Sequence, residues 1–510
     1  MIPPTKIDTT SLLTILGVIA AVWALITPNA RLRLRFCLAW WDWAIVGGAF
    51  FLSNYLVFAP ALKSLGLYFS FGPWKWGLDS SSAVYLILLA VAIYILIRLK
   101  KPKLSAGRAK IFLELVDNLH FTKRYDDLAQ LLEPQIDRLL SIIDRPMKRR
   151  FYDKVAEKLG VNNSETAAEY AHEALLNIVT SPELINHFAL AHPSLCLELM
   201  KVEPIIRSDF TSNFITALLS STNSRLYVEL KNNLNVSRGH RLLIPNNNRI
   251  LHFFFSNARF AADIAIYRDI GEDLYWRLDE DEKVISRLNK PLGSYYDISK
   301  YKCPIYSGIT LFEIMVYEGI HQGLNDHLWL HYYRHFAIKI IKNMNKQSDE
   351  YSGEWETPFH FLLCHLFSIA THWAEECAWL DEKEISLENK EIGNFDPHYI
   401  SIEATKLLGA MLQSVMTTTK LTLKSKGDIL DIVVSCYIKL KRDKQLKDVA
   451  DSLLLFTIAG EYNCTKIDYL EELLKTFNTL DCYRARMDAP EFLTAIESAI
   501  ESRVNKEKML

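Results

Sequence analysis

The chain lacks the short motifs that identify the most familiar enzyme families. It contains no G-x-x-x-x-G-K-[ST], no G-x-G-x-x-G, no G-x-S-x-G and no H-E-x-x-H. These absences count against P-loop nucleotide hydrolysis, a Rossmann-type cofactor, an α/β-hydrolase and the common zinc proteases. They do not exclude an enzyme that uses none of these motifs, although the function that we favour is non-enzymatic.

The chain also lacks an excess of one charge and a disulfide pattern. It carries 58 Lys and Arg against 60 Asp and Glu, which argues against a generally basic nucleic-acid binder. None of its eight cysteines forms a Cys-x-x-Cys pair, and their spread favours buried reduced thiols. Half of the 510 residues are hydrophobic, so a large core can form, and the length predicts two or three domains.

Long apolar runs are almost confined to the first hundred residues. Three of them, at about 10–28, 42–62 and 82–98, approach the length that a hydrocarbon layer of about 30 Å requires. The first run has no small-x-small cleavage site and two more runs follow it, so we interpret it as a retained span. The sequence therefore predicts a three-helix transmembrane module over residues 1–103.

Basic residues flank these runs on one side. Arg31, Arg33 and Arg35 separate the first two runs, and six basic residues lie within 98–110. The positive-inside rule then predicts an outside N-terminus and a cytoplasmic C-terminal region, in an inner or plasma membrane. Four residues after the third run are expected to contact anionic lipids of the inner leaflet, namely Arg98, Lys100, Lys101 and Lys103.

A few polar and small residues fall inside the predicted spans. Asp42 is expected to lie at the interface and to pair with Arg33 or Arg35, although a carboxylate in a span is also a transport candidate. Asn54 lies deeper and either packs by hydrogen bonding or lines a pore. The small residues Gly47 and Gly48 allow close helix packing, within the module or between copies of the chain.

From residue 104 onward the pattern is mainly helical. Ser181-Pro182-Glu183 and Asp488-Ala489-Pro490-Glu491 are typical helix starts. Strand-like alternation is limited to two ambiguous stretches, SRLYVELKNN and RILHFFFSN. The overall prediction is an all-α protein in which the helical region is either solenoid-like or an irregular bundle.

An acidic stretch over 380–399 predicts a linker. The cytoplasmic region is therefore divided into a helical domain at 104–390 and a C-terminal helical subdomain at 391–510. Within the subdomain the apolar pattern predicts helices near 401–425, 428–442, 446–460, 466–479 and 490–505.

Seven of the 14 histidines fall between residues 321 and 372. If the two helices that carry them pack face to face, imidazoles and a carboxylate could bind zinc or iron. The reading that we favour places these histidines as polar tips on an aromatic helix interface. The candidate ligands are His327, His331, His335, His365, His372 and Glu376.

A basic patch over Arg145–Lys154 is compatible with nucleic acid, with the inner membrane surface, or with a solvated helix face.

Together these patterns favour a membrane protein whose cytoplasmic helical domain binds a protein partner or senses a signal. Its spans would anchor it or perturb the bilayer, as homo-oligomers in the second case. The layout is similar to that of membrane-perturbing effectors in bacterial antiviral defence. The rival hypothesis is a membrane-tethered metalloenzyme that uses the histidine-rich helices between His321 and Glu376.

Overall fold

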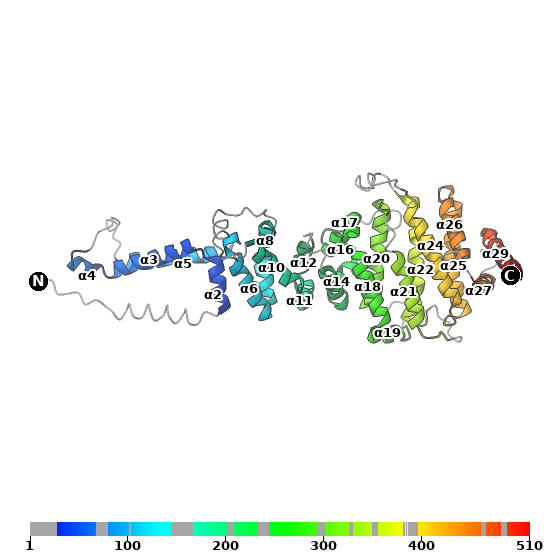
Figure 1. Ribbon diagram of the computed structural model, residues 1–510, viewed down its shortest axis with the longest axis horizontal. Helices are drawn as coiled ribbons and strands as arrows, with labels where there is room; N and C mark the ends of the chain where they lie inside the picture. Colours follow the sequence, from blue (N-terminus) through cyan, green and yellow to red (C-terminus); the bar gives the residue numbers. More distant parts are fainter. Residues whose placement is uncertain are drawn as a thin grey trace, which may run out of the picture. The chain divides into compact units, whose positions relative to one another are not determined.

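The structure is a computed structural model that contains helices and no strand among the residues that it describes (Figure 1). These residues are 28–67, 80–100, 104–143, 167–201, 209–232, 244–292, 302–325, 330–348, 355–380, 383, 385, 396–460, 466–480 and 487–509. The all-α prediction is confirmed. Both ambiguous stretches are helical, as α15 (Arg225–Asn232) and α16 (Arg249–Phe255).

The chain divides into two compact units, residues 1–188 and 189–510. The functional boundaries predicted near residues 104 and 390 stay predictions. Helices on either side of residue 390, α22 (Pro358–Glu376) and α24 (Tyr399–Thr417), pack directly against each other.

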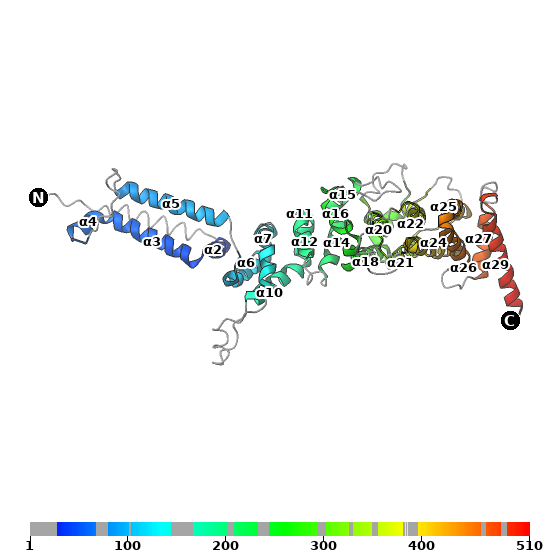
Figure 2. The ribbon, with the colours of Figure 1, turned by 90° about the horizontal axis from the view of Figure 1, so that it is seen from above.

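In the first unit, α3 (Trp40–Val57) and α5 (Ser80–Lys100) lie side by side (Figure 2). The pair is called the α3–α5 hairpin below. The helix of the predicted second span ends at Val57, and a short helix, α4 (Ala59–Ser64), follows Phe58. That stretch is therefore two helices rather than one, because Pro60 cannot donate the backbone hydrogen bond that would continue α3.

The remaining helices of the first unit begin with α2 (Pro28–Cys37), which packs on α6 (Ala109–Phe121). The rings of Phe36 and Phe112 lie 5.6 Å apart between their centroids. Residues on both sides of position 104 thus share one packed contact. The other elements are η2 (Ala106–Arg108), α7 (Tyr125–Leu132), α8 (Ile136–Ile143), α10 (Ala167–Val179) and α11 (Pro182–Ala191), which runs across the boundary between the units.

The second unit is built mainly as two rows of helices (Figure 2). One row is formed by α18 (Ile266–Asp279), α21 (Leu330–Asn343), α24 and α26 (Lys447–Ala459). The other is formed by α20 (Pro304–His321), α22, α25 (Leu423–Arg442) and α27 (Ile467–Phe477). Further helices are α12 (Pro193–Met200), α14 (Phe210–Ser220), α17 (Ala258–Asp263), α19 (Glu282–Leu288) and α29 (Pro490–Met509).

Local signals in the sequence fix several of these helix ends. The predicted starts at Pro182 and Pro490 are confirmed as the first residues of α11 and α29. The single helix expected over 401–425 is wrong, because α24 ends at Thr417 and α25 begins at Leu423. The hydroxyl of Thr422 accepts the backbone N–H of Ser425 at 3.2 Å, so Thr422 is an N-cap that starts a new helix.

Candidate functional site

The two helices of the α3–α5 hairpin meet along a seam whose side chains repeat at spacings of four and three residues. This spacing is typical of two helices that pack with a small crossing angle. The least exposed side chains of α3 include Asp42, Val46, Ala49, Ser53 and Leu56, and those at matching spacing on α5 are Val84, Ile87, Val91 and Tyr94.

A buried carboxylate joins the two helices at one end of this seam. Asp42 has no exposed surface. Its Oδ2 atom accepts the backbone N–H of Ala39 at 2.6 Å, and its Oδ1 atom accepts the hydroxyl of Tyr94. The guanidinium of Arg98 lies 3.0 Å from the same Oδ1 atom. Two hydrogen-bond donors and one positive charge thus surround the carboxylate, and they come from the start of α3 and the end of α5.

Arg98 completes this cluster from the last turns of α5. It donates its Nε–H to the hydroxyl of Tyr94 at 3.2 Å, and its guanidinium carbon lies 5.5 Å from the centre of the Tyr94 ring. The partner of Asp42 is therefore Arg98 instead of the expected Arg33 or Arg35, because the antiparallel arrangement brings the end of α5 alongside the start of α3. About half of the Arg98 side chain, 49%, stays exposed.

The lipid contacts expected after the third run stay predictions. Lys101, Lys103 and the side chain of Lys100 lie outside the described residues. The first predicted span, 10–28, lies outside them as well, except for Pro28 at the start of α2. The same holds for the basic patch Arg145–Lys154.

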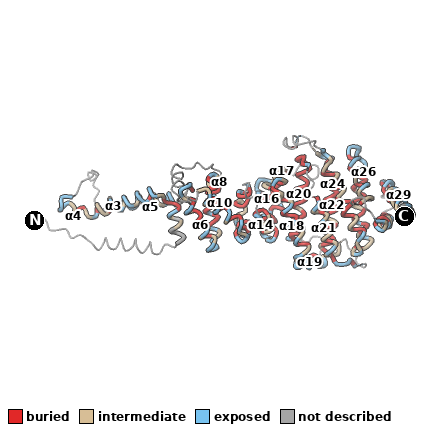
Figure 3. Tube along the Cα trace, in the orientation of Figure 1, coloured by how far each residue is buried: buried red, intermediate tan, exposed pale blue. Residues whose placement is uncertain are grey.

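Much of the hairpin is exposed (Figure 3), and its exposed side chains are mainly apolar. Among the described residues, seventeen of the 25 large apolar side chains that are exposed lie between Trp40 and Ile97. Phe51 is 74% exposed. A Cβ atom added to Gly47 or Gly48 would meet no atom within 4 Å, so neither glycine serves a close helix contact within the described part of the chain. The side chain of Asn54 donates to the carbonyl of Phe50 at 2.8 Å.

Among the described residues, the histidine-rich helices place their imidazoles in pairwise contacts. His321 and Glu376 form a buried pair, with Nε2 and Oε1 2.8 Å apart and each side chain 1% exposed. The ring of His365 stacks on that of Tyr306, with centroids 5.3 Å apart. His335 lies edge-on to Tyr275, with centroids 6.1 Å apart. These contacts are the kind expected of polar tips in an aromatic interface.

The candidate metal ligands are brought together only in part. Among the described residues, no three of His331, His335, His365, His372 and Glu376 have ligand atoms within 4.8 Å of one another. His327 lies outside the described residues. The pair that does form joins one candidate ligand, Glu376, to His321. His321 belongs to the histidine-rich segment but was not among the candidate ligands.

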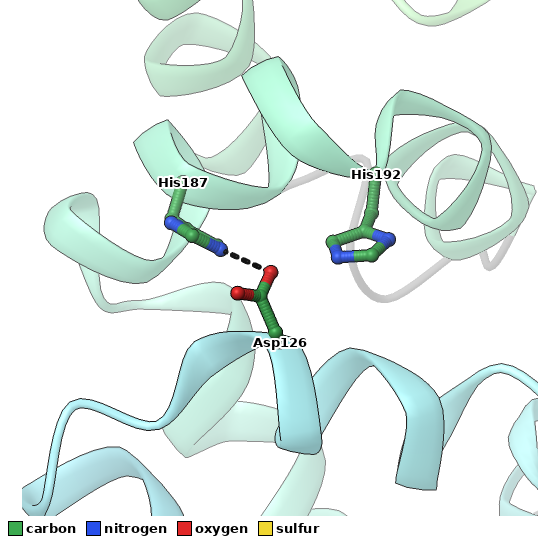
Figure 4. Close-up of side chains that lie close together, drawn as sticks. All are labelled: Asp126, His187 and His192. Carbon is green, nitrogen blue, oxygen red and sulfur yellow. Dashed lines mark hydrogen bonds and ion pairs between the residues drawn. The ribbon is translucent and has the colours of Figure 1, made fainter.

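One imidazole–carboxylate pair was not identified from the sequence (Figure 4). His187 of α11 lies with Nε2 2.9 Å from Oδ1 of Asp126 in α7. His192, labelled in the same figure, belongs to the second unit. The Asp126 side chain is 68% exposed, so the pair contributes little to stability. No local signal links two residues that far apart in the sequence.

No described helix combines the length and the apolar composition that crossing a bilayer requires. Comparisons of the chain with models of protein families, with curated proteins and with solved structures find no match.

Proposed function

We propose that this chain is a membrane-anchored protein that embeds the outer surface of the α3–α5 hairpin in a bilayer and uses its helical second unit to bind a protein partner. The observation that carries the proposal is the distribution of apolar surface. Seventeen of the 25 exposed large apolar side chains among the described residues lie between Trp40 and Ile97, and fifteen of these belong to α3 and α5.

Exposed apolar surface of this extent is unfavourable in water. Each square ångström of apolar surface left in water costs about 25 cal/mol, and soluble monomers rarely expose continuous apolar patches beyond a few hundred Å². Lipid chains solvate the same side chains without this cost. The polar groups Asp42 and Ser53 lie on the inner seam of the hairpin, which is the arrangement that a lipid environment favours.

The positions of the basic residues support an orientation. Arg98 contacts Asp42 at the start of α3, and Arg108 donates to the carbonyl oxygen of Phe36 at 2.9 Å. The basic segments on either side of the hairpin therefore meet at one of its ends. The positive-inside rule favours the cytoplasmic side for that end, which puts the residues that follow α5 in the cytoplasm.

The partner-binding part of the proposal is supported by the two rows of helices in the second unit. Stacks of this solenoid-like kind build long continuous surfaces, and proteins commonly bind extended partners on them. This support comes from architecture alone.

The test of the anchor is resistance to extraction by alkaline carbonate. We expect the wild-type chain to remain in the membrane pellet. The double variant Phe51→Lys/Leu88→Lys places charges on two exposed apolar positions of the hairpin, 74% and 45% exposed. Each lysine near a bilayer centre costs about 3 kcal/mol, so the variant should move to the supernatant.

The matched control is Val228→Lys on α15, a position that is 50% exposed in the second unit. It adds the same charge to an exposed apolar site outside the hairpin and should leave the chain in the pellet. A wild-type chain found entirely in the supernatant would refute the proposed function.

A further inference from the structure

We infer that Asp42 is a latch that couples the hairpin to the helices that follow it, so that α3, α5 and α6 change conformation together. The inference rests on the proposed membrane function, because it concerns how the same hairpin is controlled. In this view the hairpin is more than a passive anchor, because the contacts of Asp42 link its conformation to that of α6.

The first step is the convergence of separate elements on one side chain. Asp42 binds the backbone N–H of Ala39, which precedes α3, at 2.6 Å. It also accepts from Tyr94 and pairs with Arg98, which lie one turn apart near the end of α5. A single carboxylate therefore ties the entry of α3 to the exit of α5.

The second step is the link from this junction to the soluble helices. The residues just before Ala39 are buried, with Phe36 at 0% and Cys37 at 3% exposure. Arg108 donates to the carbonyl of Phe36 at 2.9 Å and to that of Cys37 at 3.4 Å. The Phe36 ring packs on Phe112 of α6. The junction between α2 and α3 is thus held on one side by Asp42 and on the other by α6 and its preceding turn.

The third step concerns what happens when the contact between Asp42 and Arg98 is lost. The Asp42 carboxylate is buried, and a buried charge that loses its partner is strongly destabilised. Loss of Arg98, whose own side chain is 49% exposed, therefore leaves the carboxylate with only the two neutral donors, the N–H of Ala39 and the hydroxyl of Tyr94. When α5 moves away from α3, the carboxylate must move toward water, and the segment from Phe36 to Asp42 moves with it.

The experiment measures hydrogen–deuterium exchange of the full chain in phospholipid nanodiscs. Asp42→Asn and Arg98→Gln should each raise exchange at least about tenfold in peptides covering 38–45 and 94–98. The same variants should also raise exchange in 109–116 of α6, which Asp42 does not touch. Tyr94→Phe removes one hydroxyl and should give a smaller rise in the same three places.

Two control variants lie close by. Tyr85→Phe removes a hydroxyl from α5 at a position that is 65% exposed, and Arg35→Gln removes an exposed charge from α2. Both should leave exchange in the three peptides unchanged. Exchange in α22 reports whether each variant keeps its fold. If Asp42→Asn fails that check, the decision falls to Arg98→Gln and Tyr94→Phe.

The outcomes separate the latch from the anchor. Faster exchange confined to α3 and α5, with α6 as in the wild type, would overturn the coupling and leave Asp42 a local packing group. No change in any of the three peptides would overturn it as well. A wild-type chain that does not associate with nanodiscs refutes the membrane function instead, and the same comparison in solution still decides the latch.

Discussion

The α3–α5 hairpin and the second unit are both helical, yet they distribute apolar side chains in opposite ways. In the second unit the large rings lie inside, as with Tyr333 and Trp373, whose centroids are 4.5 Å apart. Ion pairs such as Lys441–Glu491 lie outside. In the hairpin, Asp42 is buried and Phe51 is exposed. Both regions are helical, so they differ in which side chains face outward: polar and charged ones in the second unit, and large apolar ones in the hairpin.

The strongest way to sharpen this comparison is to truncate one aromatic side chain in each region. Trp373→Ala removes a side chain that is 1% exposed, and the resulting cavity should lower the free energy of unfolding by about 3–5 kcal/mol. Phe51→Ala removes one that is 74% exposed, and should change it by no more than about 0.5 kcal/mol. Thermal unfolding of both variants in the same detergent gives the two values. Equal losses would show that Phe51 is packed against protein.

A second prediction concerns pH and applies to the second unit. Burial raises the pKa of Glu313 in α20 from 4.5 to about 7. The folded state then binds the proton more tightly than the unfolded state, so the free energy of unfolding falls as the pH rises from 4.5 to about 7. The loss attributable to Glu313 is about 3 kcal/mol.

Glu313→Gln should remove most of this loss and raise the stability at neutral pH. Burial also raises the pKa of Asp269 to about 6, so a smaller slope of the same sign should remain. The control is Glu198→Gln on α12, whose carboxylate is 53% exposed; this variant should keep the wild-type slope. Chemical denaturation at several values between about pH 5 and 8 measures the difference. A slope that is the same in wild type and Glu313→Gln contradicts the prediction.

The smallest effect is expected from a pair of glycine substitutions. A Cβ atom at Gly409 in α24 would overlap the backbone carbonyl of Phe456 in α26, so Gly409→Ala should cost about 1–3 kcal/mol. Gly48 has no atom within 4 Å of that position, so Gly48→Ala should change stability by less than about 1 kcal/mol. If Gly48→Ala instead proves strongly destabilising or dissociates an oligomer, another helix covers this face of α3.

Local chemistry made part of this fold predictable. Proline at the first helical position identified the starts of α11 and α29. Two stretches stayed ambiguous in the sequence because β-branched and aromatic residues such as Val228 and Phe253 favour strands in isolation. In the structure both are helices, α15 and α16, and each buries an apolar face. Pro60 indicated a break between α3 and α4, but the length of the apolar run led to the prediction of one continuous span.

The sequence identified individual residues of the candidate site, but it did not predict which of them contact one another. Asp42 was recognised because a carboxylate in an apolar run is rare, but its partner depends on which helix lies beside it, and Arg98 is distant in the sequence. The spacing of the residues on the seam of α3 was present in the sequence and would have given the buried face. The sequence singled out both His321 and Glu376, but it did not predict their contact. The apolar periodicity of one helix does not reveal which of its residues contacts which residue of another helix.

The two rows of the second unit have a consequence for the order in which the protein is made. From α18 onward, the helices that pack closely are at most three helices apart along the chain. Contacts between neighbours in sequence close short loops and therefore form quickly. Each helix that leaves the ribosome meets partners that have already been synthesised, so the stack can grow from its N-terminal end.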